Sequence, residues 1–227
     1  MAELFDTIKE LRQDVVRNII NVLSSQEIFS DLLENKKEAA FIADKVIQHT
    51  HLDNDWKFHY TAAITYPFET NHFMHTRYSD GSFPIWYGSM DGTTTIYETA
   101  YHMVQTEMQI KNIQDYNYIT RERVIYNVFC EGILIDLTRK TKWFSDLTSD
   151  NYHFTQQIAK KLHQQGYPGL LTPSARHKEG INVNIFKHEL LTNPRVFCQL
   201  TYQFFPSAKI VEVYNDNHLI HTIKTNI

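Results

Sequence analysis

The sequence predicts an α+β fold, with a mixed or antiparallel β core and flanking helices. From about residue 58 onward, short runs rich in aromatic and β-branched residues are separated by turn residues, as strands require. Segments with helical periodicity interrupt these runs without alternating regularly with them, which argues against a doubly wound sheet. Before residue 50 the apolar residues recur at helical spacing, which predicts an N-terminal helical extension.

Composition places the chain among ordinary globular proteins. It has 227 residues, of which 42% are hydrophobic, and a formal net charge of −4. This length suffices for one sizeable core or a core with an extension. Lysine and arginine are scattered and outnumbered by acids, so the sequence lacks the basic stripe that direct nucleic-acid binding requires.

Cysteine use and hydropathy point to the cytoplasm. The only two cysteines, Cys130 and Cys198, lie in apolar strand-like runs, which favours reduced thiols over a disulfide framework. Charges recur every few residues near the N-terminus, so neither a signal peptide nor a membrane span is expected there. A protein secreted without a signal peptide would have the same features.

The first fifty residues are predicted to form a helical extension, with the main domain covering residues 51–227. Six apolar residues follow steps of three and four, the period of an amphipathic helix: Leu4, Ile8, Leu11, Val15, Ile19 and Val22. A second helix is expected over "SQEIFSDLLENKKEAAFIADKVIQHT". The apolar stripe requires a partner, which would be the chain's own sheet, a second copy or another protein.

The middle of the chain supplies the predicted helices and central strands. "FPIWYGS" is expected to be a strand, and a helix is expected to begin near Thr93 with Glu98 in its second turn. "ITRERVIYNVFCEGILIDLT" predicts two strands joined around Glu131 and Gly132. "YHFTQQIAKKLHQQGY" predicts a helix that stops at Gly166.

The last sixty residues are dominated by predicted strands. These are "GLLTPSA", "INVNIF" and "FCQLTYQFF", followed by a hairpin, "KIVEVYNDNHLIHTIK", whose turn runs from Asn215 to Asn217.

Two segments carry a candidate site. The first, "TRYSDGSFPIWYGSMDGTTTIYETAYH", contains Arg77, Tyr87 and Glu98, and the second, "GYPGLLTPSARHKEGINVNIF", contains Ser174 and Arg176 at the exit of a strand. Loops at strand ends are where sites are usually built. Glu98 has apolar neighbours that would partly desolvate it, which a surface helix would rarely tolerate.

The two segments together resemble the RES domain, the toxin half of RES–Xre toxin–antitoxin pairs. The resemblance covers roughly residues 58 to 223. Arg77 matches the family arginine, Tyr87 the tyrosine in the strand, Glu98 the helix glutamate and Ser174 the serine of the "PS-R" motif. In many members a tryptophan and an asparagine follow the arginine, where this chain has "YS".

The resemblance implies an ADP-ribosyltransferase-like fold and NAD as the substrate. Family members include NAD hydrolases, NAD phosphorylases and some protein ADP-ribosyltransferases, and the resemblance does not choose among them. It also implies a growth-inhibiting toxin that an Xre-type antitoxin blocks, with no metal or prosthetic group. An inactive RES-like binding module is the alternative from a different class, and self-association is left open.

The chemistry of such a reaction assigns roles to these residues. Cleavage of an N-glycosidic bond with a cationic leaving group passes through an oxocarbenium-like state, which the negative charge of Glu98 would stabilise. Arg77 would pair with the pyrophosphate through its planar fork. Tyr87 would stack on nicotinamide or bond the ribose, Ser174 would orient Glu98 or the amide, and Arg176 would line the same cleft or cap its loop.

Two other kinds of site fit the sequence less well. His72 and His75 with His102 suggest a metal site, but a third ligand with clear geometry is missing. Ser89 or Ser174 with a histidine suggests a hydrolase triad, but the sequence has no nucleophile-elbow motif.

Overall fold

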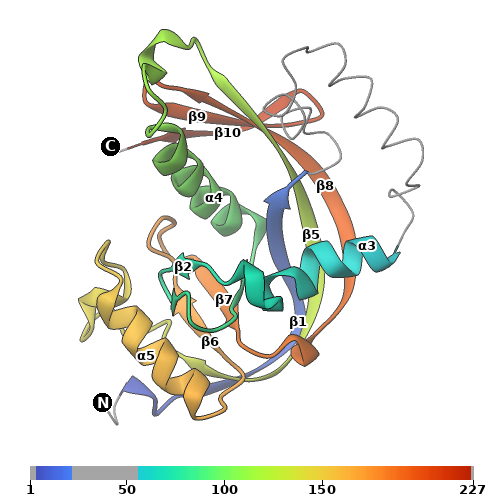
Figure 1. The fold of residues 1–227 in the computed structure, drawn as a ribbon, viewed down its shortest axis with the longest axis vertical. Coiled ribbons are helices and arrows are strands. Elements are labelled where there is room, and N and C mark those ends of the chain that lie inside the picture. The colour runs from blue at the N-terminus through green and yellow to red at the C-terminus, as the bar shows by residue number, and fades with distance from the viewer. Residues whose placement is uncertain (1–3, 22–55, 226–227) are drawn as a thin grey trace.

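The protein is organised around one large sheet. The computed structural model describes residues 4–21 and 56–225 (Figure 1). The main sheet has eight strands, in the order β1-β4-β7-β6-β5-β8-β9-β10. Their bounds are β1 (Ile8–Ile20), β4 (Trp86–Ser89), β5 (Ile119–Asp136), β6 (Gly169–Pro173), β7 (Ile181–Ile185), β8 (Leu191–Phe205), β9 (Ile210–Asn215) and β10 (His218–Lys224).

Smaller elements surround this sheet. A second, two-stranded sheet joins β2 (His75–Thr76) to β3 (Ser79–Asp80). The α-helices of the described residues are α3 (Trp56–Tyr60), α4 (Gly92–Glu107) and α5 (His153–Gln164). Single turns of π- or 3₁₀-helix occupy Thr61–Thr65, Tyr66–Phe68, Thr70–His72, Ile113–Asp115, Ser145–Leu147 and His188–Leu190.

Five strands of the main sheet close into a ring. β1 pairs with both β4 and β5, and the order β4-β7-β6-β5 returns to β1. All of these pairings are antiparallel except β5 with β6. Beyond the ring, β5 continues into an antiparallel extension with β8, β9 and β10. The mixed, mostly antiparallel sheet with flanking helices confirms the predicted α+β class.

The predicted first helix is wrong, because its residues form β1. This strand pairs with β5 in an unbroken antiparallel register from Ile8 opposite Ile135 to Ile20 opposite Arg123. A spacing of four residues fits a strand as well as a helix, because four is a multiple of the two-residue strand period. Leu11 and Val15 therefore share the buried face, whereas Ile8 lies on the other face and is 63% exposed. The predicted second helix and the boundary near residue 50 lie outside the described residues.

The two strands predicted around Glu131 and Gly132 are one continuous strand, β5. Gly132 is not at a turn but opposite Leu11 in the ladder. A Cβ on Gly132 would lie 2.5 Å from Leu190 Cδ2. The glycine thus allows Leu190 to pack closely on the strand, which a turn-based interpretation of the sequence overlooks.

Most other predicted elements are confirmed. The expected strand at "FPIWYGS" is β4, and the helix expected near Thr93 is α4 with Glu98 in its second turn. α5 ends before Gly166, whose φ of 79° is the left-handed conformation that ends a helix. The remaining predicted strands are β6, β7 and β8, and the final hairpin is β9 and β10.

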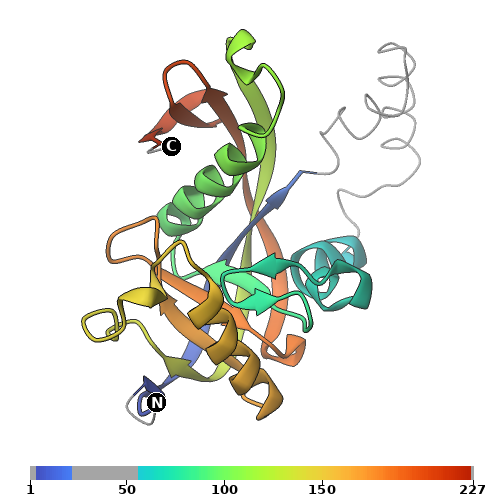
Figure 2. The ribbon, with the colours of Figure 1, turned by 60° about the vertical axis from the view of Figure 1, so that its left-hand side comes forward.

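Three apolar clusters fix the positions of the helices. The ring encloses Trp86, whose indole N–H donates to the Ala63 carbonyl at 2.7 Å. α4 packs through Ala100 and Val104 on β8 and β9, and α5 packs through Ile158 and Leu162 near β6. α4 and α3 lie on different sides of the long strands β1 and β5 (Figure 1 and Figure 2). Because α4 and α5 pack in two separate apolar clusters, each helix is anchored independently of the other.

Two further observations concern the thiols and the membrane. Cys130 and Cys198 are both free, as predicted, and burial raises the pKa of the Cys130 thiol to about 12. No helix among the described residues is long and apolar enough to cross a membrane.

The strand assignment of β1 predicts contrasting costs for two substitutions. Leu11→Ala should lower the free energy of unfolding by about 2–5 kcal/mol, because Leu11 is 1% exposed within the ring. Ile8→Ala should change it by less than about 0.5 kcal/mol, because Ile8 faces solvent. Urea denaturation of the full chain measures both. Equal losses would contradict the strand, since one helical stripe would bury both residues.

Candidate active site

The five predicted site residues come from four separate elements. Arg77 lies in the turn between β2 and β3, Tyr87 in β4 and Glu98 in α4, whereas Ser174 and Arg176 follow β6. Figure 1 shows β2, β6 and β7 in the region between α4 and α5. A continuous series of hydrogen bonds and ion pairs joins Glu98 to Ser174, to Arg176 and, through Asp150, to Arg77. The structure thus brings these four predicted residues into one region, and the Tyr87 hydroxyl contacts the turn that carries Arg77.

The Glu98 carboxylate is held through one of its two oxygens. Oε1 accepts a hydrogen bond from Ser174 Oγ at 2.6 Å and another from Asn182 Nδ2 at 2.8 Å. Among the described residues, no side chain or backbone group is seen to bond Oε2. Two donors on the same oxygen fix the plane of the carboxylate. One oxygen is therefore anchored while the other remains available to a ligand.

The start of α4 holds Glu98 in place. Asp91 caps the helix by accepting from the Thr94 N–H at 2.7 Å, and Thr94 Oγ1 also donates to it at 2.7 Å. Replacing such a cap typically costs about 1 kcal/mol. Glu98 follows one turn after Thr94, so the capped start of the helix fixes the backbone from which its side chain projects.

Ser174 organises the loop that leaves β6. Its Oγ accepts the backbone N–H groups of Arg176 at 3.1 Å and His177 at 2.9 Å while donating to Glu98. Its own N–H donates to the Gly180 carbonyl at 2.8 Å. The hydroxyl therefore fixes both the loop and the carboxylate. Of the two roles that the sequence left open for Ser174, orienting Glu98 or orienting the nicotinamide amide, these contacts favour the first.

Asn182 in β7 is a site residue that the sequence interpretation missed. Its amide donates to Glu98, and its carbonyl oxygen accepts from Ser89 Oγ in β4 at 2.9 Å. The Ser89 bond fixes the amide orientation, so the N–H side is the one that faces Glu98. A signal was present, because "INVNIF" places two asparagines two residues apart in an otherwise apolar strand, and buried amides need a partner.

The Arg77 turn is clamped by α5. Thr155 Oγ1 donates to the Arg77 carbonyl at 2.5 Å, and Gln156 Nε2 donates to the Thr76 carbonyl at 2.7 Å. Lys160 further pairs with Asp80 at 2.7 Å. These bonds hold the backbone of the turn, so the guanidinium of Arg77 projects from a fixed base.

Tyr87 in β4 also holds the turn that carries Arg77. Its hydroxyl lies 2.5 Å from Thr76 Oγ1 and accepts the Tyr78 N–H at 2.9 Å. Burial raises the pKa of Tyr87, so the hydroxyl stays protonated at neutral pH. Because the hydroxyl is already engaged on both sides, Tyr87 acts in this structure as a residue that positions Arg77.

Two arginines meet at one carboxylate beside this turn. Arg176 Nη2 donates to Asp150 Oδ1, and Arg77 Nη2 lies 3.9 Å from the same oxygen. The Arg176 hydrogen bond lowers the pKa of Asp150, which is therefore ionised at neutral pH. Arg176 thus belongs to the site, and Asp150 is a second residue that sequence reasoning missed, in a turn with no distinguishing pattern.

Tyrosine rings support both guanidinium groups. The Arg77 guanidinium carbon lies 4.6 Å from the centroid of the Tyr152 ring, and that of Arg176 lies 3.3 Å from the centroid of the Tyr101 ring. Such cation–π contacts hold a cation without neutralising it. Tyr101 lies three residues after Glu98 on α4, so the helix presents both to the same side.

The arrangement separates positive from negative charge. Two arginines and Asp150 leave a net positive charge at one end, while Glu98, held by neutral donors, provides a negative charge at the other. A ligand with an anionic part and a cationic part fits this polarity.

The two competing sites are not assembled. His72 stacks on Tyr66 at 3.9 Å and lies 3.2 Å from Glu69, whereas His75 contacts Gln156. Within the described ranges, no group of three or more His, Cys, Asp or Glu side chains is placed to hold a metal. Ser89 and Ser174 donate to Asn182 and Glu98 instead of to a histidine, which does not make a hydrolase triad.

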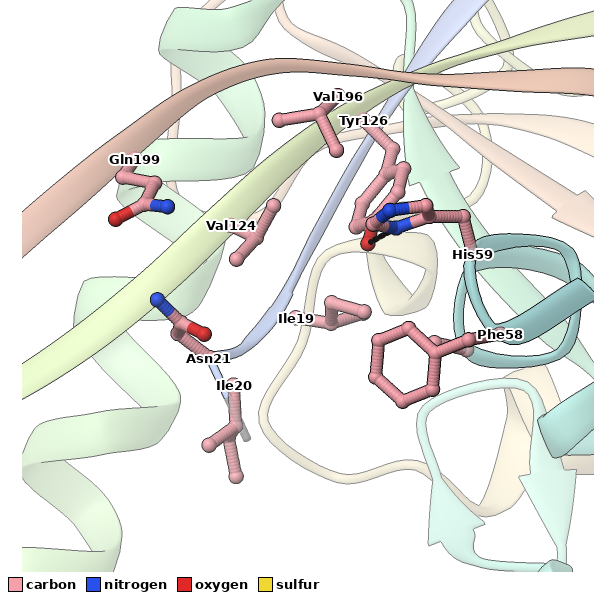
Figure 3. Close-up of a pocket in the computed structure, with 10 residues that line it drawn as sticks. Ile19, Ile20, Asn21, Phe58, His59, Val124, Tyr126, Val196 and Gln199 are labelled. Carbon is pink, nitrogen blue, oxygen red and sulfur yellow. Dashed lines mark hydrogen bonds between the residues drawn. The ribbon is translucent and has the colours of Figure 1, made fainter. Parts of the chain in front are cut away.

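A cavity elsewhere does not share these residues. It has a volume of about 270 Å³ and lies between the end of β1, α3 and the strands β5 and β8 (Figure 3). Its lining is mainly apolar, with one hydrogen bond of 2.7 Å between His59 and Tyr126. Asn21 and Phe58 both line it, and none of the charged site residues does.

Tyr87→Phe should destabilise the protein. The substitution removes the acceptor of the Tyr78 N–H, and Tyr78 is only 1% exposed, so the lost bond should cost about 1–3 kcal/mol of unfolding free energy. Urea denaturation measures the loss. Tyr116→Phe, at a residue that is 52% exposed, is the matched control and should be neutral. An unchanged stability for Tyr87→Phe would show that its hydroxyl does not hold the turn.

Comparisons with known proteins identify the family of the chain. The RES domain family model matches residues 48–204. A chain of the crystal structure of the M. tuberculosis MbcT–MbcA toxin–antitoxin complex has a similar fold, with a TM-score of 0.50, 11% identity and 88% of each chain covered. No curated protein matches the chain. The family match spans the helix of Glu98, the turn of Arg77 and the loop of Ser174, and the chain therefore belongs to the RES domain family.

Proposed function

We propose that this protein is a RES-domain toxin that cleaves the nicotinamide–ribose bond of NAD. The observation that carries the proposal is the Glu98 carboxylate, anchored at 2.6 Å by Ser174 and at 2.8 Å by Asn182, close to a pair of arginines. NAD has the polarity that this site fits, with an anionic diphosphate and a cationic nicotinamide. The diphosphate binds Arg77 and Arg176, and the nicotinamide ribose lies against Glu98.

The reaction needs little proton transfer. When the bond between the ribose C1′ and the nicotinamide nitrogen breaks, its electron pair returns to the cationic ring, which leaves as neutral nicotinamide. Positive charge then develops on the ribose, and the Glu98 carboxylate stabilises it. The anchored oxygen keeps the carboxylate from turning away, and no reorganisation is required in the transition state.

The acceptor decides the product class. Water at C1′ gives ADP-ribose and a proton, phosphate gives ADP-ribose 1″-phosphate, and a protein side chain gives an ADP-ribosylated protein. We favour hydrolysis or phosphorolysis as the reaction of this chain, with protein modification as the second candidate activity. Incubating the purified chain with labelled NAD, with and without phosphate and cell extract, separates the three products. A folded chain that leaves NAD intact in all conditions would support an inactive binding module instead.

A partner protein follows from the proposed activity. An enzyme that depletes NAD in the cytoplasm harms its own cell unless it is blocked, and the similar fold occurs in a toxin–antitoxin complex. We therefore include an antitoxin of Xre type in the proposal. Co-expression with the product of the adjacent open reading frame should restore growth and form a complex that purifies together.

Glu98→Gln should abolish NAD consumption without unfolding the chain. The amide keeps the shape and can still accept from Ser174 and Asn182, but it lacks the charge that stabilises the transition state, so kcat should fall at least about a hundredfold. Glu131→Gln, at an exposed residue of β5, is the control and should retain full activity. Near-normal turnover by folded Glu98→Gln would remove Glu98 from the mechanism.

Asn182→Asp should change the pH profile as well as the rate. A carboxylate would replace the donor that lies 2.8 Å from Glu98 Oε1, and two adjacent carboxylates share a proton, which raises the pKa of the pair. Glu98 must be ionised, so the acid limb of kcat should move upward by at least about one pH unit, with activity recovering as pH rises.

Asn182→Ala is the matched variant for this test. It removes the same hydrogen bond without adding charge, so it should lower kcat and move the acid limb by less than Asn182→Asp does. If Asn182→Asp keeps the acid limb of the unsubstituted protein, the amide does not act through Glu98.

A further inference from the structure

Asp150 and its two arginines differ sharply in exposure. The Arg77 side chain is 11% exposed and that of Arg176 is 15% exposed, whereas the Asp150 side chain is 71% exposed. Two largely buried cations therefore share a single anion that sits at the solvent side. Because the pairs contain two positive charges and one negative charge, the cluster keeps a net positive charge.

The arginines are fixed independently of Asp150. Arg77 lies over Tyr152 and donates through Nη1 to the Ser149 carbonyl, and Arg176 lies over Tyr101. The backbone of Arg176 is held by Ser174 Oγ, which also bonds Glu98. The positions of both guanidinium groups therefore have other supports, and Asp150 is an occupant of the space between them rather than their scaffold.

Asp150 lies on a short connection between the 3₁₀ turn Ser145–Leu147 and α5. The turn around it is closed by other groups, because Ser149 Oγ accepts the Asn151 N–H at 3.1 Å and Asn151 Oδ1 accepts the His153 N–H at 3.0 Å. The Asp150 side chain is thus held by its ion pairs with the two arginines, together with a hydrogen bond from Tyr101. Because the Asp150 carboxylate is 71% exposed, water already competes for it, and another anion can displace it from the arginines.

We propose that Asp150 is an affinity-determining residue whose carboxylate occupies the site that the diphosphate of the substrate takes. The inference rests on the proposed function for the identity of the ligand. Planar guanidinium groups bind phosphate oxygens through paired hydrogen bonds, and a diphosphate offers more acceptor oxygens and more negative charge than one carboxylate. Binding exchanges Asp150 for the diphosphate, and the exchange weakens the affinity for every anionic ligand at this site.

Asp150→Asn tests the exchange, because asparagine keeps the size of the side chain and removes its charge. The full chain would be titrated with inorganic pyrophosphate and with ADP-ribose by calorimetry at fixed ionic strength. The dissociation constant should fall about threefold to tenfold for both probes, which corresponds to about 0.6–1.4 kcal/mol of competition that the Asp150 carboxylate no longer exerts.

Asp146→Asn is the matched control. Asp146 lies four residues earlier and is exposed, it makes no ion pair with either arginine, and its substitution changes the net charge by the same amount. Its affinity for both probes should equal that of the unsubstituted protein. Equal tightening in both variants would mean that net charge alone is responsible and would overturn the proposal.

The outcomes separate this inference from the proposed function. Weaker or unchanged binding by Asp150→Asn, in a chain that consumes NAD, would overturn the role of Asp150 and leave the NAD reaction intact. Tighter binding of pyrophosphate by Asp150→Asn, in a chain that leaves NAD intact, would support the exchange while the NAD reaction fails. Binding of neither probe by any of the three proteins would overturn the anion site itself.

Discussion

The hydrogen bonds to one oxygen of Glu98 are the interaction on which the rest of the site depends. A helix, the loop after β6 and the strand β7 each contribute one partner, so the carboxylate is held only when all three are correctly packed. The ring of five strands provides that packing, because it sets β4, β6 and β7 side by side. The fold thereby converts a flexible side chain into a fixed negative charge.

The loop after β6 also positions the positively charged end of the site, which is formed by Arg77 and Arg176. Ser174 bonds Glu98 through its hydrogen and the backbone of Arg176 through its oxygen, so one hydroxyl relates the carboxylate to the arginine pair. Arg77 reaches the same place from a turn that α5 and Tyr87 hold. Preorganised opposite charges suit a dinucleotide whose reacting end becomes positive while its centre stays negative.

Local signals in the sequence predicted much of this architecture. The start of α4 near Thr93, the stop at Gly166 and the final hairpin each depend on residues close together in the chain, and all were predicted correctly. β1 was not, because a four-residue spacing satisfies strands and helices alike, and only its pairing with β5 decides between them. The turn predicted at Gly132 was wrong for a similar reason. The close contact that requires a glycine there is with Leu190, which lies far away in sequence.

The residues of the candidate site also fall into those that the sequence pattern predicts and those that only the structure identifies. Glu98, Ser174 and the two arginines lie in segments whose pattern resembles a family, and the structure brings them together. Asn182 and Asp150 act through contacts between distant segments, and single residues in a strand and a turn give no comparable pattern. Local sequence patterns therefore do not predict how α4, the turn between β2 and β3, the loop after β6 and the turn of Asp150 are placed relative to one another.

A crystal structure of the Glu98→Gln protein with NAD bound tests the central claim most directly. The account predicts the diphosphate between Arg77 and Arg176, the Asp150 side chain displaced, and the C1′ of the nicotinamide ribose in contact with the substituted side chain. NAD bound with its diphosphate away from both arginines, or with C1′ out of reach of residue 98, would contradict it.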